Sequence, residues 1–146
     1  MGSTLRHHFK DERGVTLIEL LVVILIVGIL ASVGIPALLN QRHKAYDAAA
    51  KTQIRQAAQA EEIYAEDHGT YVSEAIGPGD TGPLATIEPT MKQSPDVTAT
   101  ANGTAGYTLV SAAVGGGGDV FTYDEANGKI TRTCSGNGGG CLGGSW

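Results

Sequence analysis

Residues 20 to 39 read LLVVILIVGILASVGIPALL, a run of twenty residues without one charged side chain. An α-helix needs about 20 apolar residues to cross a hydrocarbon layer of about 30 Å, so the run predicts a membrane-spanning helix. A cleaved secretory signal is the alternative, with Ala31 and Gly34 imitating its cleavage site. Its apolar core normally has about 7 to 15 residues, however, and this run extends well before and after that pair.

The segment before the span, MGSTLRHHFKDERG at residues 1 to 14, is too short and polar to fold by itself and predicts a leader. It carries three basic and two acidic side chains, against Arg42 and Lys44 just after the span. The positive-inside rule therefore favours a cytoplasmic N-terminus and an exported C-terminal part. Loss of the leader changes the net charge from −5 to −6. The chain has the length of one domain. Because its net charge is negative, it is not expected to bind nucleic acid over its whole surface.

Glu19 is the exception in this apolar region, because a carboxylate inside a bilayer costs on the order of 2.5 to 3.5 kcal/mol on insertion scales. One interpretation places Glu19 at the interface, where the positive end of the helix dipole favours an acidic residue in the first turn. The other is that cleavage after Gly14 frees an amine on Val15, and that Glu19 pairs with such an amine at membrane depth. The second interpretation predicts a role in assembly.

The run Arg13–Glu19, RGVTLIE, followed by Leu20–Ile24 and a helix with Gly28 and Pro36, strongly resembles the class III signal of type IV pilins and the related pseudopilins. The resemblance is close from Lys10 to about Tyr71 and covers the rest only in general layout. It implies an α+β, pilin-like fold, in which a long N-terminal helix, its first half transmembrane, packs on a small antiparallel sheet.

By this resemblance Gly14 precedes the cleaved bond, and Val15 becomes the N-methylated first residue of the mature chain. Glu19 then neutralises the N-terminal amine of a neighbouring subunit. The family usually begins its mature chain with Phe, and Val15 departs from that pattern while still permitting cleavage. The implied segments are a leader at 1–14, a transmembrane and polymerisation segment at 15–40, and an exported globular domain at 41–146.

The implied function is that of a structural subunit of a type IV pilus-type filament. Its partners would be identical or related pilin subunits, a prepilin peptidase/N-methyltransferase, an assembly platform and the membrane. It would lie in the cytoplasmic membrane before assembly and in an extracellular or cell-envelope filament afterwards. The alternatives are a pseudopilin of a type II secretion or DNA-uptake machine, and a single-pass anchored binding domain that never polymerises.

Three residues weaken the spanning helix. Gly28 and Gly34 expose backbone, and Pro36 removes an amide donor and clashes with the carbonyl group of Ser32. Glycine and proline are common in ordinary transmembrane helices as well. Because pilin filaments often lose helicity in this stretch, the resemblance favours local melting after assembly.

Beyond the span, residues 38 to 67 contain no Gly or Pro, which predicts that the helix continues to His68-Gly69. Its apolar stripe is expected at Tyr46, Ala50, Ile54, Ala57 or Ala58, and Tyr64.

After the helix, proline and glycine between Val72 and Ala105 predict a loop, with a short helix or turn near 87–92. Three strands are expected at Gly106–Ala112, Val120–Tyr123 and Lys129–Thr133. The last two should be joined by a turn at Asn127-Gly128.

Cys134 and Cys141 are separated by SGNGGG, a flexible spacer. A disulfide suits the oxidising compartment, and a zinc site is disfavoured because neither His43 nor His68 is spaced to complete four ligands. The bridge resembles the one that bounds a C-terminal surface loop in many pilins, and it favours a pilin over a pseudopilin. We expect no catalytic group, metal or cofactor. Asp67, His68 and Ser73 are close in sequence, but nothing near them supplies the oxyanion site that a hydrolase needs. The polar residues at 124–127 lack the ligand spacing of a calcium loop and are better explained by a hairpin turn.

Overall fold

A computed structural model describes residues 14–92, 95–115, 118–136 and 139–146. The chain divides into two units, Met1–Pro36 and Ala37–Trp146, and helix α1, Leu17–His68, runs through the boundary between them. Within the described residues, α1 is the one helix long and apolar enough to span a membrane, with a mean hydropathy of 2.8 over its best window. The leader expected at residues 1–14 lies outside the described part except for Gly14.

Helix α1 ends where the sequence predicts. Gly69 follows it with φ of 72°, and its N–H donates to the Ala65 carbonyl oxygen at 2.8 Å. Glycine adopts this left-handed conformation without steric cost, and the hydrogen bond satisfies a carbonyl group at the helix end.

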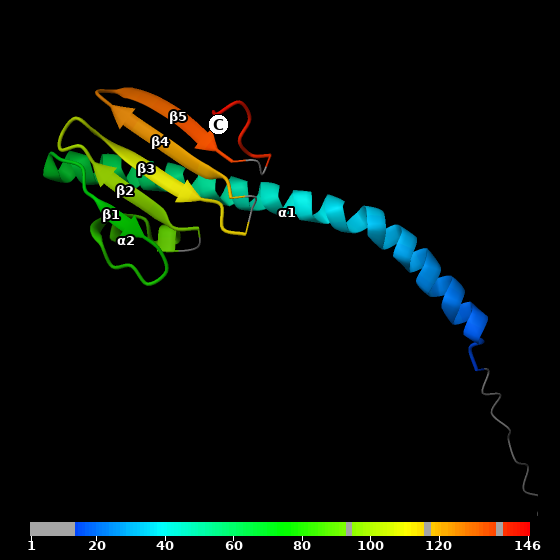
Figure 1. The fold of residues 1–146 in the computed structure, drawn as a ribbon. Coiled ribbons are helices and arrows are strands. Elements are labelled where there is room, and N and C mark those ends of the chain that lie inside the picture. The colour runs from blue at the N-terminus through cyan, green and yellow to red at the C-terminus, as the bar shows by residue number, and fades with distance from the viewer. Residues whose placement is uncertain (1–13, 93–94, 116–117, 137–138) are drawn as a thin grey trace, which may run out of the picture. The chain divides into compact units, whose positions relative to one another are not determined.

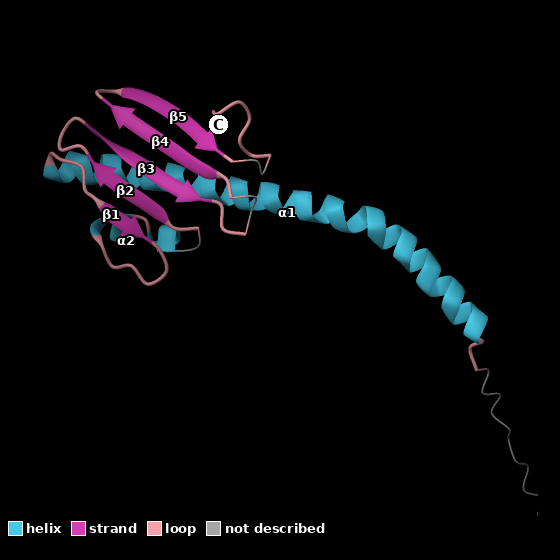
Figure 2. Cartoon of the chain, in the orientation of Figure 1, coloured by secondary structure: helices cyan, strands magenta, loops and turns pink. Residues whose placement is uncertain are grey.

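The second unit contains a five-stranded antiparallel sheet in the order β1-β2-β3-β4-β5, so each strand pairs with its neighbour in sequence (Figures 1 and 2). The α+β, pilin-like arrangement expected from the sequence is confirmed. The elements after α1 are β1 Glu74–Ile76, α2 Pro83–Ile87, the 3-10 helix η1 Pro89–Lys92, β2 Val97–Ala101, β3 Gly106–Ala112, β4 Val120–Ala126 and β5 Lys129–Ser135.

The hydrophobic core lies between α1 and one face of the sheet. Ala50, Ile54 and Ala57 of α1 are fully buried, as are Tyr107 of β3 and Phe121 of β4. Leu84 of α2 and Met91 of η1 complete the core beside β1. The small alanine side chains allow the helix to approach the sheet closely, while each aromatic ring contributes a large buried apolar area.

The apolar stripe predicted along α1 is correct for residues 50 to 58, and Tyr64 packs against the core from a partly buried position. Tyr46 is the error, since it is 42% exposed. Its ring lies beside Gly115, at the rim of the unit, and leaves the tyrosine face open to solvent.

The short helix or turn expected near 87–92 is confirmed by η1, but the rest of the loop predicted from Val72 to Ala105 is wrong, because β1, α2 and β2 lie within it. Strand β2 has the sequence VTATA, whose alanines give little local preference for a strand. Its pairing with β3 along five residues, and the burial of Val97 and Ala99, hold it in the sheet. Tertiary pairing thus overrides a weak local signal.

The three strands predicted at the C-terminal end are confirmed. β3 has the predicted bounds, while β4 and β5 continue to Ala126 and Ser135. Asn127 and Gly128 join β4 to β5 with φ of 53° and 78°. Positive φ at both central residues is the type I′ geometry that suits the twist of a two-residue hairpin.

One carboxylate lies inside the core. Glu61 of α1 is fully buried, and its Oε2 accepts a hydrogen bond from the Val72 N–H at 3.1 Å. Its Oε1 has no hydrogen-bond partner among the described residues. Burial raises the pKa of Glu61 to about 7, and the nearby carboxylates of Glu74 and Glu62 add to the rise against the opposing effect of the Val72 hydrogen bond.

Glu61→Gln should therefore stabilise the fold at pH 8 by up to about 3 kcal/mol and leave it unchanged near pH 4. Below its unfolded pKa of about 4.5 the carboxyl is protonated in both states. Between that pH and about 7 the unfolded chain releases the proton first, so stability falls as pH rises. Thermal unfolding of the detergent-solubilised chain at several pH values measures this. Glu66→Gln, at an exposed carboxylate of the same helix, is the control, and equal stability of wild type and Glu61→Gln at pH 8 would contradict the prediction.

Candidate functional site

The first turn of α1 is built by a reciprocal pair of polar side chains. The Thr16 N–H donates to Glu19 Oε2 at 2.8 Å, and the Glu19 N–H donates to Thr16 Oγ1 at 3.3 Å. This capping box satisfies two of the amide groups that lack partners at a helix start. The Thr16 hydroxyl also donates to Glu19 Oε2 at 2.9 Å, so a single carboxylate oxygen accepts both bonds from Thr16.

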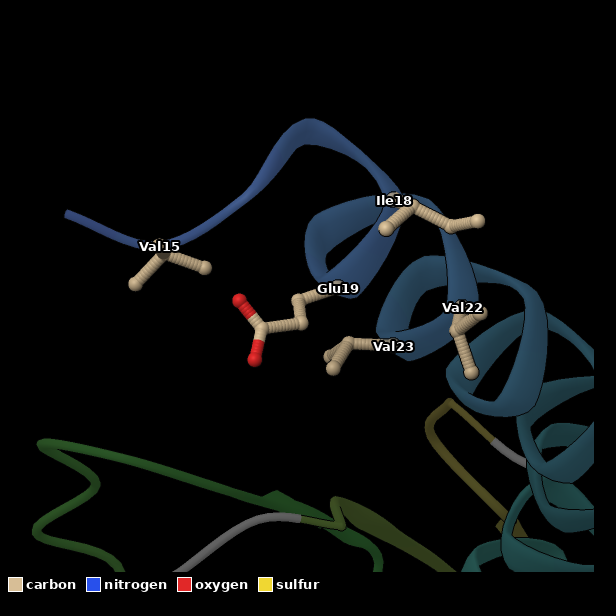
Figure 3. A pocket seen from close by; sticks show the side chains of 5 residues that line it. All are labelled: Val15, Ile18, Glu19, Val22 and Val23. Atoms are coloured by element: carbon tan, nitrogen blue, oxygen red, sulfur yellow. The ribbon is translucent and has the colours of Figure 1, made fainter.

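Glu19 Oε1 accepts no hydrogen bond from any described residue, which leaves half of the carboxylate available. Figure 3 shows the carboxylate of Glu19 on the side of the helix start where Val15 lies. The other three residues around it, Ile18, Val22 and Val23, line the same open hollow with apolar side chains. The arrangement presents one negatively charged oxygen in an apolar surface.

No side chain from residue 14 to residue 36 other than Glu19 carries a charge. The counter-charge for the carboxylate must therefore come from outside this set of side chains. An amine at Val15, created by cleavage of the Gly14-Val15 bond, has the required charge. Gly14 and Val15 are exposed immediately before the helix, where this backbone is not part of a regular element.

The helix-weakening residues lie further along α1. Gly28, Gly34 and Pro36 are all within the unbroken helix, and a Cβ at either glycine would meet no atom within 4 Å. The Ser32 hydroxyl donates to the Ile29 carbonyl oxygen at 2.7 Å in the turn before Pro36. Melting of this stretch in an assembled filament stays a prediction, since the helix described here is that of a single chain.

The two cysteines form the disulfide expected from the sequence, with their Cα atoms 5.5 Å apart. Three further bonds hold the segment after Cys141 against the sheet. The Cys134 N–H donates to the Gly144 carbonyl oxygen at 2.9 Å, the Ser145 hydroxyl to the Arg132 carbonyl oxygen at 3.1 Å, and the Trp146 indole N–H to the Thr122 carbonyl oxygen at 3.2 Å. The disulfide is therefore one of several interactions that hold the C-terminal segment against the sheet.

Replacing Cys134 and Cys141 together by serine should cost about 2 kcal/mol or less, because the loop closed by the bridge is short and the main-chain ties remain. Hydrogen exchange should show faster exchange near residues 139–146 and little change in β3. Thiol labelling without reductant provides the companion test in the exported wild-type protein. Two freely reactive thiols, or global unfolding of the double variant, would contradict this expectation.

The polar groups considered for catalysis or metal binding have structural contacts. His68 Nδ1 lies 3.0 Å from the Tyr64 carbonyl oxygen, and its ring stacks on Tyr64. Asp124 accepts a hydrogen bond from the Thr108 hydroxyl at 2.8 Å, and Glu125 accepts one from the Gly128 N–H at 2.6 Å. Within the described ranges, no group of three or more His, Cys, Asp or Glu side chains is placed to hold a metal ion.

Sequence reasoning overlooked Thr16. The signal was present, since Thr16-Leu17-Ile18-Glu19 has the spacing of a capping box. The charge of Glu19 is conspicuous in the sequence, whereas Thr16, which orients the Glu19 carboxylate through hydrogen bonds, carries no charge.

Two comparisons with known proteins bear on this site. Residues 9–35 match the family model described as the prokaryotic N-terminal methylation motif, which includes Gly14, Val15 and Glu19. The chain is also 42% identical over 64 residues to the type IV wide pilus major component PilA4 of Thermus thermophilus. That alignment covers 44% of this chain and 49% of the relative, so the chain spans about half the length of the curated relative it matches.

Proposed function

We propose that this chain, whose methylation motif and pilin relative support the type IV pilin family, is a structural subunit of a pilus-type filament. The observation that carries the proposal is the carboxylate of Glu19. It is the one ionisable side chain in the apolar segment after Gly14, and it lies one helical turn from the Val15 amine that cleavage would create.

Maturation begins with hydrolysis of the Gly14-Val15 peptide bond, which leaves a carboxylate on Gly14 and an amine on Val15. The new amine then takes a methyl group from a sulfonium-type methyl donor supplied to the methyltransferase, and it loses a proton as the N–C bond forms and the donor's S–C bond breaks. A prepilin peptidase/N-methyltransferase is the partner for both steps. Before assembly the subunit spans the cytoplasmic membrane through residues 15–40 with a cytoplasmic N-terminus, and the exported domain comprises residues 41–146.

In the filament, Glu19 Oε1 accepts a hydrogen bond from the charged Val15 amine of a neighbouring subunit, while Glu19 Oε2 keeps its hydrogen bonds from Thr16. Such a pair is strong because the surrounding side chains are apolar and exclude water. Each charge compensates the other, and loss of one partner leaves the second buried and unpaired. Extended apolar contact along residues 15–40 supplies the remaining attraction, and Gly28, Gly34 and Pro36 allow the helix to adjust its packing.

The cell-envelope assembly platform and related pilin subunits complete the partners of this proposal. The disulfide between Cys134 and Cys141 supports a pilin over a secretion or DNA-uptake pseudopilin, by resemblance to the C-terminal bridge of pilins. A monomeric membrane-anchored binding domain gives no role to Glu19, since a plain anchor is weakened by a carboxylate.

The test is to shear surface filaments from cells and identify their subunits by intact-mass spectrometry. The expected subunit begins at Val15 and carries one added methyl group on its amine. Detection of the chain in the membrane alone, with no copy in sheared filaments, would overturn the pilin function in favour of the pseudopilin or the anchor.

A further inference from the structure

Two exposed arginines converge on one aromatic ring at the edge of the sheet. Arg55 projects from α1 and Arg132 from β5, and each guanidinium carbon lies 5.6 Å from the centre of the Trp146 ring. Arg132 also lies 5.4 Å from the centre of the Tyr123 ring. We name Arg55, Arg132, Tyr123 and Trp146 the arginine cluster.

The arginine cluster borders a hollow of about 270 Å³, lined by Arg55 and Arg132 together with Tyr107 and Tyr123. Glu62 also lines the hollow, but in the described part of the chain neither guanidinium forms an ion pair with it or with any other carboxylate. Arginine guanidinium groups bind carboxylates through paired N–H donors. Tyr107 is fully buried and Tyr123 is 6% exposed, so neither tyrosine that lines the hollow offers an open ring face for stacking of nucleotide bases. The hollow suits a carboxylate.

Exposed carboxylates are few on this unit. Among the described residues from 37 to 146 they are Glu62, Glu66, Asp67 and Asp96. Three of the four belong to the last two turns of α1. Glu62 already lines the hollow and accepts a hydrogen bond from the Tyr107 hydroxyl at 3.1 Å. The remaining pair, Glu66 and Asp67, forms what we name the acidic end of α1.

The acidic end is unfavourable within a single subunit. The C-terminus of a helix carries the negative end of the dipole, so carboxylates in the last turn are disfavoured by typically 0.3 to 1 kcal/mol. The arginine cluster brings the like charges of Arg55 and Arg132 to one ring, and neither charge has an ion-pair partner among the described residues. Each feature offers the charge that the other lacks, and local features that oppose the stability of the subunit often mark a functional surface.

We propose that the arginine cluster of one subunit binds the acidic end of α1 of a second copy in the filament. Arg55 and the acidic end lie eleven or twelve residues apart on one helix, which is about 16 to 18 Å at 1.5 Å per residue. The two surfaces differ, so the contact is heterologous and repeats head to tail instead of closing as a symmetric dimer. The arrangement relates successive copies by a shift along the direction of α1.

This inference rests on the proposed filament function, and the experiment separates the two. Both double variants are made in the full chain with Glu19 unchanged. Arg55→Glu combined with Arg132→Glu reverses the charge of the arginine cluster. Glu66→Lys combined with Asp67→Lys reverses the charge of the acidic end. Each double variant should lower the ratio of sheared filament to processed membrane subunit by about tenfold or more, since like charges then meet. The variant with all four changes should recover most of the wild-type ratio.

The matched controls are Lys129→Glu, an exposed cation on the same strand as Arg132, and Asp96→Lys, an exposed carboxylate away from α1. Both should leave the ratio within about twofold of wild type, as expected for isolated surface charges. Protease resistance of the processed subunit verifies its fold. The milder pair Arg55→Gln and Arg132→Gln keeps the side-chain stems over the ring and should yield filaments whose disassembly depends less on salt.

Normal filament yield from either charge-reversed pair would overturn the contact while leaving the filament function intact. Failure of the fourfold variant to recover would overturn it as well, because the two surfaces would then act separately. A loss confined to the arginine variants, together with single-stranded DNA binding by wild-type filaments that the Arg55→Gln and Arg132→Gln pair lacks, would overturn the contact and reassign the cluster to nucleic acid. Absence of filaments from the wild-type chain would instead refute the proposed function.

Discussion

Glu19→Ala should abolish surface filaments while the subunit is still inserted, cleaved and methylated. Without the carboxylate, the Val15 amine of a neighbouring subunit would be buried without a partner, at a cost of several kcal/mol. Insertion should not suffer, because alanine enters a bilayer more readily than a carboxylate. The measurement is the yield of sheared filaments beside the amount of processed subunit in the membrane.

The capping box makes a sharper version of this experiment possible. Glu19→Gln keeps the spacing of a capping box, which glutamine supports, and removes the charge. Thr16→Ala keeps the charge and removes the hydroxyl, at a typical cost of about 1 kcal/mol in helix capping. We expect far fewer filaments from Glu19→Gln than from Thr16→Ala.

Glu19→Asp, which keeps the charge on a shorter side chain, should give an intermediate yield. Wild-type filament yield from either Glu19→Ala or Glu19→Gln would remove the assembly role and favour a simple membrane anchor. A defect in Thr16→Ala as large as that in Glu19→Gln would attribute the effect to the start of the helix instead of the charge.

Gly14→Phe should leave the chain with its leader and prevent filament formation. A peptidase must approach the backbone at the Gly14-Val15 bond, and a side chain at Gly14 obstructs that approach. Nothing lies within 4 Å of the position a Cβ would take at Gly14, so the described part of the folded chain itself tolerates the change. Intact-mass measurement of membrane-extracted subunit distinguishes the full-length from the processed chain.

Val15→Phe is the matched control for Gly14→Phe, because it introduces the same ring one residue later. Phenylalanine is also the usual first residue of mature type IV pilins, which this chain resembles. It should be cleaved as in wild type. Efficient cleavage of Gly14→Phe, or a wild-type mature chain that begins near Ser32, would show that the leader boundary lies elsewhere.

Strong local patterns account for what could be predicted from the sequence. The uncharged run and the absence of Gly and Pro after it predict α1, and Asn127-Gly128 predicts the last hairpin. β1 and β2 were missed because Glu74–Ile76 is only three residues long and because Val97–Ala101 is a short segment that contains alanines and follows a stretch rich in proline and glycine. Their strand structure depends on pairing that a local pattern does not encode.

The same division applies to the site. Glu19 could be predicted because a charge in an apolar segment is conspicuous in any sequence. The arginine cluster could not, since Arg55 and Arg132 are 77 positions apart and meet only when β5 lies at the edge of the sheet beside α1. Spatial convergence of this kind follows from the register of Tyr123 with Arg132 across β4 and β5.

The sequential order of the strands has a consequence for how the exported domain acquires its structure. Every strand in β1-β2-β3-β4-β5 joins the edge left by the one before it, and none inserts between two strands already paired. The connections after β2 are short, with four residues before β3, seven before β4 and two before β5, whereas 20 residues separate β1 from β2. Short loop closure at these later steps lowers the entropic barrier and favours rapid folding. In the export proposed above, the chain leaves the membrane beginning with α1 and meets its strands in the order in which they pair. The sheet could thus form progressively during translocation, and β5 would remain the last edge to be completed.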